Sequence, residues 1–260
     1  MSIGGKDIAK APGHWILARM GKKVLRPGGR ELTVKLMEAL AVTPSDDVAE
    51  FAPGLGFTAA MALARHPRSY TEIELDSDAV ALLRARLGGP GRTFVEGTAA
   101  HTGLADGAVD KVYGEAMLTM QADHRKAEIV REAFRILRPG GIYAIHELGL
   151  MPDALGEAEK ATVQRDLATA IRVNARPLTR TEWTALLEDA GFTVQWSATS
   201  PMRLLEAGRM VADEGLIRTL RIGWNIMNHP VARARLLEMR RVFRLHRHHI
   251  NAIALTARRP

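Results

Sequence analysis

Residues 47–60 read Asp47-Val48-Ala49-Glu50-Phe51-Ala52-Pro53-Gly54-Leu55-Gly56-Phe57-Thr58-Ala59-Ala60, and the predicted fold is built around this segment. We read it as an apolar strand, a turn of small residues and an alanine-rich helix. A glycine-rich turn between a strand and a helix N-terminus is where open α/β sheets bind nucleotides. The glycines favour this use because backbone without a side chain can approach a ligand closely.

A second strand is predicted over Ser69–Asp76, and it also ends in acidic residues. Glu74 follows Glu50 by 24 residues, the spacing at which an acid accepts hydrogen bonds from ribose hydroxyls. The turn has alanine, Ala59, where the dinucleotide fingerprint has its third glycine, which that fingerprint tolerates. A dehydrogenase therefore stays among the alternatives, whereas the chain has no Gly-Lys-Ser/Thr for a phosphate-binding loop.

Five stretches in the right order give the chain a resemblance to the class I S-adenosylmethionine-dependent methyltransferases. They are 50–56 after the first strand, 74–80 after the second, Val95-Glu96-Gly97-Thr98-Ala99-Ala100, 108–117, and Ile136-Leu137-Arg138-Pro139-Gly140-Gly141-Ile142 before a strand. The resemblance implies a doubly wound, mostly parallel, seven-stranded Rossmann-like sheet. It also implies S-adenosyl-L-methionine as cofactor.

Carried over residue by residue, the resemblance predicts a set of cofactor-binding positions. The set is Glu50, Ala52, Gly54, Gly56, Glu74, Asp76, Thr98, Ala99 and Glu115. Two of them depart from the family pattern, because Ala52 replaces a glycine and Thr98 replaces a frequent aspartate.

Composition excludes several kinds of site. The chain has no cysteine, so disulfides, thiolate metal ligands and cysteine nucleophiles are impossible. No stretch approaches the ~20 uninterrupted apolar residues of a membrane span, and the first residues lack the pattern of a signal peptide. We therefore expect a cytoplasmic protein without a transmembrane segment.

The positive charge gathers near the C-terminus. Residues 201–260 contain 12 arginines and 4 acidic residues, while the whole chain has a net charge of +7. Such a region attracts nucleic acid, an anionic membrane surface or an acidic substrate, although a solvated helical face explains it equally well.

The pattern of apolar residues predicts the remaining elements and one continuous methyltransferase domain over 1–260. Helices are expected at His14–Met20, Glu31–Leu40, Thr58–Arg65, Asp78–Leu87, Asp123–Leu137, Pro152–Asn174 and Trp183–Ala190, the last capped by Thr181. Further strands are expected at Thr93–Glu96, Asp110–Gly114, Ile142–Glu147, Phe192–Ser197 and Asn251–Ala257. Three more helices, Arg203–Glu214, Leu216–Met227 and Val231–His246, fall between the last two strands.

These elements divide the domain into a helical N-terminal arm (1–42), a cofactor-binding half (43–149) and two helical insertions (150–178 and 200–248). We expect the insertions to form a lid over the methyl acceptor. A packing surface or a homodimer interface is the alternative. Within the arm, His14, Trp15 and Arg30 are candidate substrate-binding residues, and Arg26 could also touch a ligand.

Three ionisable residues follow strands at the edge where the chemistry is expected. Glu115 comes after the fourth strand, and His146 with Glu147 end the fifth. Histidine is the natural general base for a hydroxyl acceptor at neutral pH. Since side chains alternate along a strand, His146 and Glu147 should face opposite sides. His246 and His249 have helical spacing but no nearby acid, so we predict no metal site.

The sequence thus predicts methylation of a small-molecule acceptor, which the positive charge allows to be anionic. A hydroxyl of a sugar, phenol or quinol is the favoured acceptor. The chain lacks the Asn/Asp-Pro-Pro-aromatic motif that resembles amino-group methylation of bases or glutamine, and this absence favours O- or C-methylation over N-methylation of a base. Two alternatives remain. One is a nucleic-acid methyltransferase that uses the arginine-rich region, although few aromatic residues there could stack on bases. The other is a non-catalytic cofactor-binding interaction protein.

Overall fold

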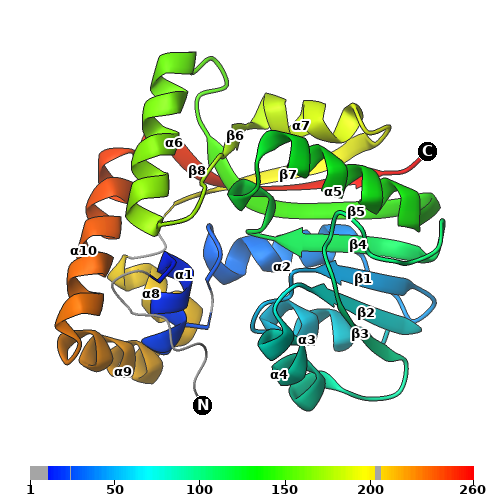
Figure 1. Ribbon diagram of the computed structural model, residues 1–260, viewed down its shortest axis with the longest axis horizontal. Coiled ribbons are helices and arrows are strands. Elements are labelled where there is room, and N and C mark those ends of the chain that lie inside the picture. Colours follow the sequence, from blue (N-terminus) through cyan, green and yellow to red (C-terminus); the bar gives the residue numbers. More distant parts are fainter. Residues whose placement is uncertain (1–10, 24, 203–205) are drawn as a thin grey trace.

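Eight strands form one sheet in the computed structural model, which describes residues 11–23, 25–202 and 206–260 (Figure 1). They are β1 (Asp47–Phe51), β2 (Ser69–Glu74), β3 (Arg92–Glu96), β4 (Val109–Glu115), β5 (Leu137–Leu150), β6 (Leu178–Thr179), β7 (Thr193–Pro201) and β8 (Ile250–Arg258). Seven of them follow the order β3-β2-β1-β4-β5-β8-β7, and the two-residue β6 pairs with β5. Only β8 runs antiparallel to its described neighbours, so the predicted mostly parallel, doubly wound sheet is confirmed.

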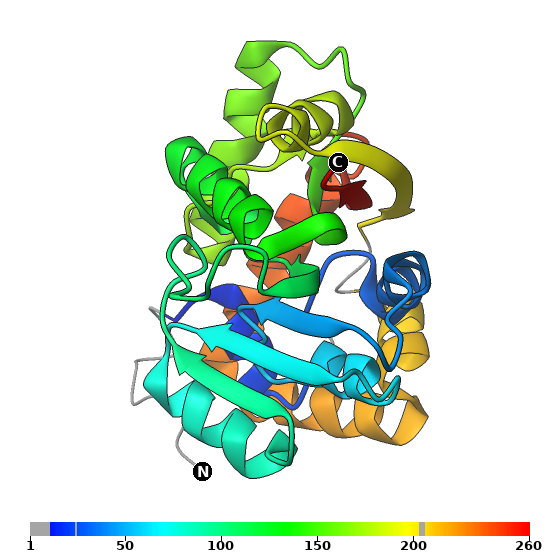
Figure 2. The ribbon, with the colours of Figure 1, turned by 90° about the vertical axis from the view of Figure 1, so that its right-hand side faces the viewer.

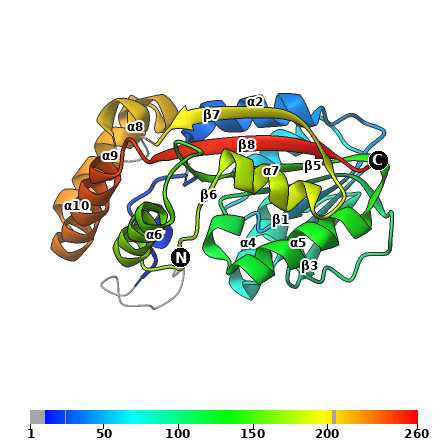
Figure 3. The same cartoon turned by 90° about the horizontal axis from the view of Figure 1, so that it is seen from above.

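Helices cover both faces of the sheet, as Figure 3 shows from above. The helices are α1 (Gly13–Arg19), α2 (Gly29–Leu40), α3 (Phe57–Leu63), α4 (Ser77–Leu87), α5 (Asp123–Ile136), α6 (Glu157–Ile171), α7 (Arg180–Glu188), α8 (Ala207–Glu214), α9 (Leu216–Met227) and α10 (Pro230–Leu245), with a 3-10 turn, η1, at Leu118–Met120. Helix α2 lies on one face and α5 and α7 lie on the other.

Side chains alternate between the two faces along each strand, and each face of the sheet packs into its own core. In β1, Val48 packs with Leu36 of α2 on one face, while Ala49 and Phe51 pack with Ile129 of α5 on the other. All of these side chains are buried. A strand buried on both faces carries apolar residues on both of them, and in β1 only Glu50 interrupts the apolar run from Val48 to Phe51.

A third core lies beyond the end of the sheet. Helices α1, α6, α9 and α10 pack around Leu148 and Leu150 of β5 and Ile250 of β8. This helical group occupies the left of Figure 1, and Figure 2 shows α8 beside α2. Within the described residues, no helix has the length and apolarity needed to cross a membrane.

The bounds of two neighbouring helices were predicted wrongly. The helix expected over 152–174 spans only Glu157–Ile171, because Gly156 is extended and Arg172 turns left-handed with φ 54°. The next helix begins after Thr179 rather than Thr181. Thr179 and Glu182 form a capping box, with the Glu182 carboxylate accepting from the Thr179 N–H at 2.7 Å.

The other insertion and the N-terminal arm follow the prediction more closely. Helix α9 has the predicted bounds. Helix α8 starts at Ala207, and residues 203–205 of the helix expected there lie outside the described residues. Residues 1–10 of the arm do so as well. The loop expected through Arg30 ends earlier, because α2 already begins at Gly29.

Gly56 shows how tightly the nucleotide-type turn packs. It has φ +67°, and a Cβ there would lie 2.7 Å from Leu83 and 2.9 Å from Leu87 of α4. We expect Gly56→Ala to lower the free energy of unfolding by about 1–3 kcal/mol. Gly54→Ala is the matched control, since its φ is +56° but its Cβ would meet nothing closer than 4.0 Å. Urea unfolding would contradict this if both variants lost equal stability.

Candidate active site

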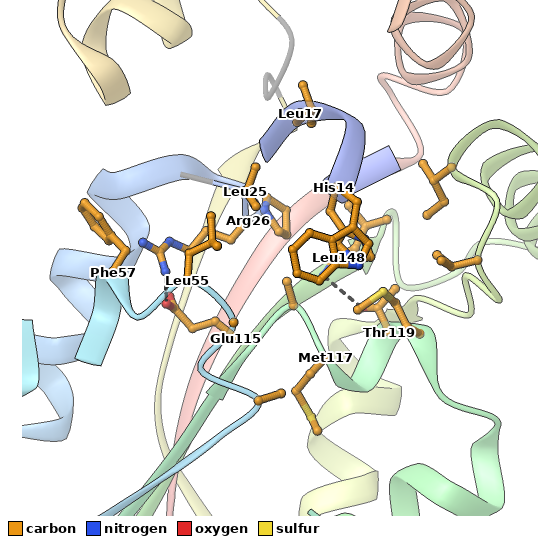
Figure 4. Close-up of a pocket in the computed structure, with 18 of the residues that line it drawn as sticks. His14, Leu17, Leu25, Arg26, Leu55, Phe57, Glu115, Met117, Thr119 and Leu148 are labelled. Atoms are coloured by element: carbon orange, nitrogen blue, oxygen red, sulfur yellow. Dashed lines mark hydrogen bonds and ion pairs between the residues drawn. The ribbon is translucent and has the colours of Figure 1, made fainter. Parts of the chain in front are cut away.

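A cavity of about 320 Å³ opens where the order of the strands reverses (Figure 4). The chain passes from β1 to β2 on one side and places β4 on the other. Residues just after β1 (Ala52, Gly54) and at and after the end of β4 (Glu115, Met117) line the cavity. Such a crevice at the carboxyl ends of parallel strands is where open α/β sheets bind ligands.

The turn after β1 is held by the acid at the tip of β2. Ala52 and Gly54 adopt left-handed backbone conformations, with φ 51° and 56°. Glu74 accepts a hydrogen bond from the Gly54 N–H at 3.2 Å and another from the Leu75 N–H at 2.9 Å. Glu74 also lines the cavity, where an acid can accept further hydrogen bonds from a ligand.

Four of the nine predicted cofactor positions line the cavity: Ala52, Gly54, Glu74 and Glu115. The others lie outside its lining and have contacts of their own. Asp76 caps α4, accepting from the N–H groups of Asp78 at 3.0 Å and Ala79 at 3.1 Å. Gly56 packs on α4, Thr98 Oγ1 accepts from the Ala100 N–H at 3.3 Å, and Ala99 belongs to the core of the α5 face.

Glu50, the fifth residue outside the lining, lies within the sheet on the α2 face. Its carboxyl oxygen accepts a hydrogen bond from the Tyr70 hydroxyl at 2.5 Å, and Tyr70 in turn contacts the Tyr113 hydroxyl. Burial raises the pKa of Glu50 to about 8. At neutral pH the carboxyl is therefore mainly protonated, which suits a group buried in the sheet.

Glu115 is the centre of a buried polar cluster at the floor of the cavity. One carboxylate oxygen lies 2.5 Å from Arg26 Nη1 and accepts from the Thr58 hydroxyl. The other lies 2.7 Å from His146 Nδ1 and accepts from the Thr33 hydroxyl at 2.7 Å. Figure 4 shows Arg26 reaching Glu115 from the chain segment before α2.

This cluster fixes the charge of Glu115. Burial alone would raise the pKa of Glu115, but Arg26 and His146 outweigh it and lower the pKa to about 2. Arg26 stacks over the Phe57 ring at 4.7 Å. Its Nε and Nη2 atoms are buried and have no hydrogen-bond partner among the described residues. Two donors are thus available beside the cavity for an anionic group of a ligand.

His146 and Glu147 point to opposite sides of β5, as the alternation predicted. His146 is fully buried and contacts Glu115, but it does not line the cavity. Glu147 accepts hydrogen bonds from the N–H groups of Met117 at 3.0 Å, Leu118 at 2.8 Å and Thr119 at 2.9 Å, and from the Thr119 hydroxyl at 2.7 Å. These bonds hold η1 against the end of β5.

The far part of the cavity is apolar and comes from the helical group. Its side chains include Leu17, Leu25, Leu148, Ile171, Met202, Met239 and Phe243. His14 and Trp15 of α1 also line it, with ring centroids 5.4 Å apart. Burial lowers the pKa of His14 below its ordinary value of 6.5. At neutral pH, therefore, His14 is an uncharged imidazole beside an apolar space.

Arg30, the remaining predicted substrate-binding residue, is exposed on α2 and lies outside the cavity lining. Its N–H donates to Asp213 of α8 at 2.9 Å. His246 lies 2.8 Å from Asp166 Oδ2. The part of the chain that the structure describes contains no group of three His, Asp or Glu side chains able to hold a metal ion.

The prediction missed the hydroxyls of Thr33 and Thr58 and most of the apolar wall. Thr33 could have been found, because it lies on the same helical face as Leu32, Leu36 and Leu40, where a polar residue needs a buried partner. Met239 and Phe243 gave no such signal, since apolar residues on a helix face usually mean core.

Comparison with known proteins agrees with this geometry. The family described as Methyltransferase domain matches residues 49–145, which run from β1 into β5. A protein of Haemophilus influenzae is 32% identical over 220 residues, covering 83% of this chain and 85% of that relative. An uncharacterised methyltransferase of Synechocystis is 30% identical over 182 residues, covering 69% of this chain and 83% of that relative. This chain belongs to the class I S-adenosylmethionine-dependent methyltransferases.

Solved structures extend the likeness of fold over nearly the whole methyltransferase. The [4+2]-cyclase SpnF superposes with a TM-score of 0.69 at 17% identity, covering 100% of this chain and 99% of SpnF. Phosphoethanolamine N-methyltransferase 2 of Haemonchus contortus, in complex with S-adenosyl-L-methionine, gives a TM-score of 0.69 at 14% identity and covers 95% of this chain and 57% of that one. One fold thus serves a cyclase and an N-methyltransferase, so the acceptor must be inferred from the site.

Proposed function

We propose that this methyltransferase methylates a hydroxyl group of a small apolar acceptor. S-adenosylmethionine supplies an activated methyl group, so the protein has to position the acceptor and take up its proton. The observation that carries the proposal is the apolar part of the cavity, in which His14 is the uncharged base.

The polar side of the cavity fits the cofactor. Glu74 would accept hydrogen bonds from the ribose hydroxyls, at the tip of β2 where such an acid is expected. The amino-acid part of the cofactor is a zwitterion, and it matches the charges of Arg26 and Glu115. The unpartnered Nε and Nη2 of Arg26 suit its carboxylate. The ionised Glu115, whose oxygens are already hydrogen-bonded, would attract the ammonium group through its negative charge rather than through a direct hydrogen bond.

For the base, His14 fits better than the three residues suggested by the sequence. Glu115 lines the cavity, but a pKa of about 2 makes it a weak proton acceptor at neutral pH. His146 does not line the cavity, and Glu147 is committed to η1 by four hydrogen bonds. In our proposal the bond from methyl carbon to sulfur breaks, the bond from carbon to the acceptor oxygen forms, and the hydroxyl proton passes to His14.

The insertions would act as the lid. Ile171 from residues 150–178, and Met202, Met239 and Phe243 from residues 200–248, line the apolar part of the cavity. Together with α1 they would exclude water from the acceptor. Lys23 is exposed and also contributes to the lining, which leaves room for an acceptor with an anionic substituent.

An acceptor screen with radiolabelled S-adenosylmethionine tests this function. We expect methyl transfer to apolar phenols and quinols, with an O-methyl product identified by mass spectrometry. The same panel should include their amine analogues and RNA oligonucleotides. Transfer to the amines or the RNA, with none to any hydroxyl compound, would overturn the proposal.

A further inference from the structure

Helix α9 carries an apolar face that the described residues leave exposed. Leu216, Ile217, Leu220, Trp224 and Met227 are 62%, 86%, 65%, 66% and 66% exposed. At 100° per residue they fall within an arc of about 100° on the helix. Ile222, the buried residue of this helix, lies roughly opposite. The inner side of α9 is thus packed, and its outer side offers apolar surface to whatever lies outside.

The apolar face continues onto α10 and is surrounded by arginine. Val231, Leu237 and Leu245 are 50%, 57% and 67% exposed on α10. Between them α10 exposes Arg233, Arg241 and Arg244, and α9 exposes Arg221. We call the outer surface of α9 and α10 the α9–α10 face.

The charge of the whole chain is concentrated in this segment. Residues 215–249 contain eight arginines and one acidic residue, Glu238, a net charge of +7. The other 225 residues have 28 basic and 28 acidic side chains and are neutral overall. An apolar surface patch on this methyltransferase therefore coincides with its excess positive charge.

A surface that is both apolar and rich in arginine matches one kind of partner. A helix with Trp, Leu and Ile on one side and Arg around it lies in the interface of a bilayer, with the apolar side chains among the acyl chains and the arginines at the lipid phosphates. We propose that the α9–α10 face docks this methyltransferase onto an anionic membrane surface. Charge complementarity decides the choice, because two copies of a face that exposes four arginines, Arg221, Arg233, Arg241 and Arg244, would repel each other.

Docking would bring the acceptor side of the active site to the membrane. The outer side of α10 carries Leu237 and Arg241, while Met239 and Phe243 of its inner side line the cavity. A lipid surface bound to α10 is therefore separated from the cavity by a single helix. This step rests on the proposed apolar acceptor, whereas the docking itself does not.

Vesicle sedimentation with the full chain tests the docking without any assay of methyl transfer. We expect binding to mixed phosphatidylglycerol–phosphatidylcholine vesicles at physiological ionic strength, and weak binding to phosphatidylcholine alone. Tryptophan emission should shift to the blue on binding, and the Trp224→Phe variant should lose most of that shift while keeping its affinity. Trp15, Trp183 and Trp196 lie on other elements and provide the background, and Trp183 is fully buried.

Two variants separate the charge from the apolar contribution. Arg221→Glu/Arg233→Glu should lower the partition coefficient at least 30-fold, since each basic residue near an anionic surface contributes about fivefold. Ile217→Ser/Leu220→Ser/Trp224→Ser should lower it by roughly 30-fold or more through lost insertion. All five side chains are exposed, so circular dichroism should show both variants folded.

Arg131→Glu/Arg180→Glu is the matched control. It makes the same change of charge at exposed positions on α5 and α7, far from α9 in Figures 1 and 2. Binding of this control should stay within twofold of wild type. The proposal is overturned if the control loses as much binding as Arg221→Glu/Arg233→Glu, or if the serine variant binds vesicles like wild type. The proposal is also overturned if light scattering shows a dimer of the wild type that the serine variant does not form. The face would then bind a second copy of the chain.

Discussion

His14→Gln is expected to reduce kcat by about 10²–10⁴-fold, the usual contribution of a general base. Glutamine keeps a polar side chain of similar reach but does not accept the hydroxyl proton at neutral pH. Affinity for S-adenosylhomocysteine, measured by calorimetric titration, should stay close to wild type, because His14 lies on the acceptor part of the cavity. A similar loss of cofactor affinity and of kcat would contradict the role of a base.

The role of His14 as a base also predicts how kcat changes with pH. Burial lowers the pKa of His14, so the imidazole stays uncharged at pH 7 and gains its proton only below 6.5. Wild-type kcat should therefore be flat near neutral pH and fall on the acid side below 6.5. Glu115 is ionised throughout this range and adds no step. The residual kcat of His14→Gln should lack the acid fall.

His146→Asn is the matched histidine control for this experiment. His146 contacts Glu115 and lies outside the cavity lining, so we treat it as a positioning residue. Its loss should weaken cofactor binding through Glu115 more than it lowers kcat at saturating cofactor. An acid fall in kcat that disappears in His146→Asn but persists in His14→Gln would assign the base to His146 instead.

The sheet could be predicted because its signals are local. Glu74 marks the end of β2, and Leu137-Arg138-Pro139-Gly140-Gly141 marks the start of β5, each through a few neighbouring residues. Helix α9 was predicted with its bounds, and the structure places Gly215 at its N-cap and Asn228 at its C-cap. A helix boundary was predicted wrongly where two residues could serve as the N-cap. Judged from the sequence alone, Thr181 is as good a cap as Thr179.

The site could be predicted only in part because its contacts are distant in the chain. Arg26 meets Glu115 across 89 positions, and Thr33 meets it across 82. No spacing rule connects such residues, since their meeting depends on how α2 lies across β5 and β8. Glu74, by contrast, needs only the turn 20 residues before it, and both were named from the sequence.

Arg26→Met is expected to lower the free energy of unfolding at pH 7 by about 3–5 kcal/mol, the usual result of removing one partner of a buried ion pair. The side chains of Arg26 and Glu115 are 10% and 6% exposed, with 2.5 Å between Nη1 and Oε2. Without Arg26, burial dominates at Glu115 and its pKa rises. Because a lowered carboxyl pKa stabilises the fold above its unfolded value, the deficit should be full at pH 7 and shrink as the pH falls below 4.5.

The double variant Arg26→Met/Glu115→Gln distinguishes an unpaired charge from lost packing. The glutamine that replaces Glu115 would be uncharged and could still bond Thr33 and Thr58, so most of the stability lost in Arg26→Met should return. Urea unfolding of the wild type, of Arg26→Met, of Glu115→Gln and of the double variant gives the coupling energy between the two side chains. If the double variant is as unstable as Arg26→Met alone, Arg26 contributes through its stacking on Phe57 rather than its charge. Cofactor affinity should remain low in both variants, since neither retains the Nε and Nη2 donors that we assign to the carboxylate of S-adenosylmethionine.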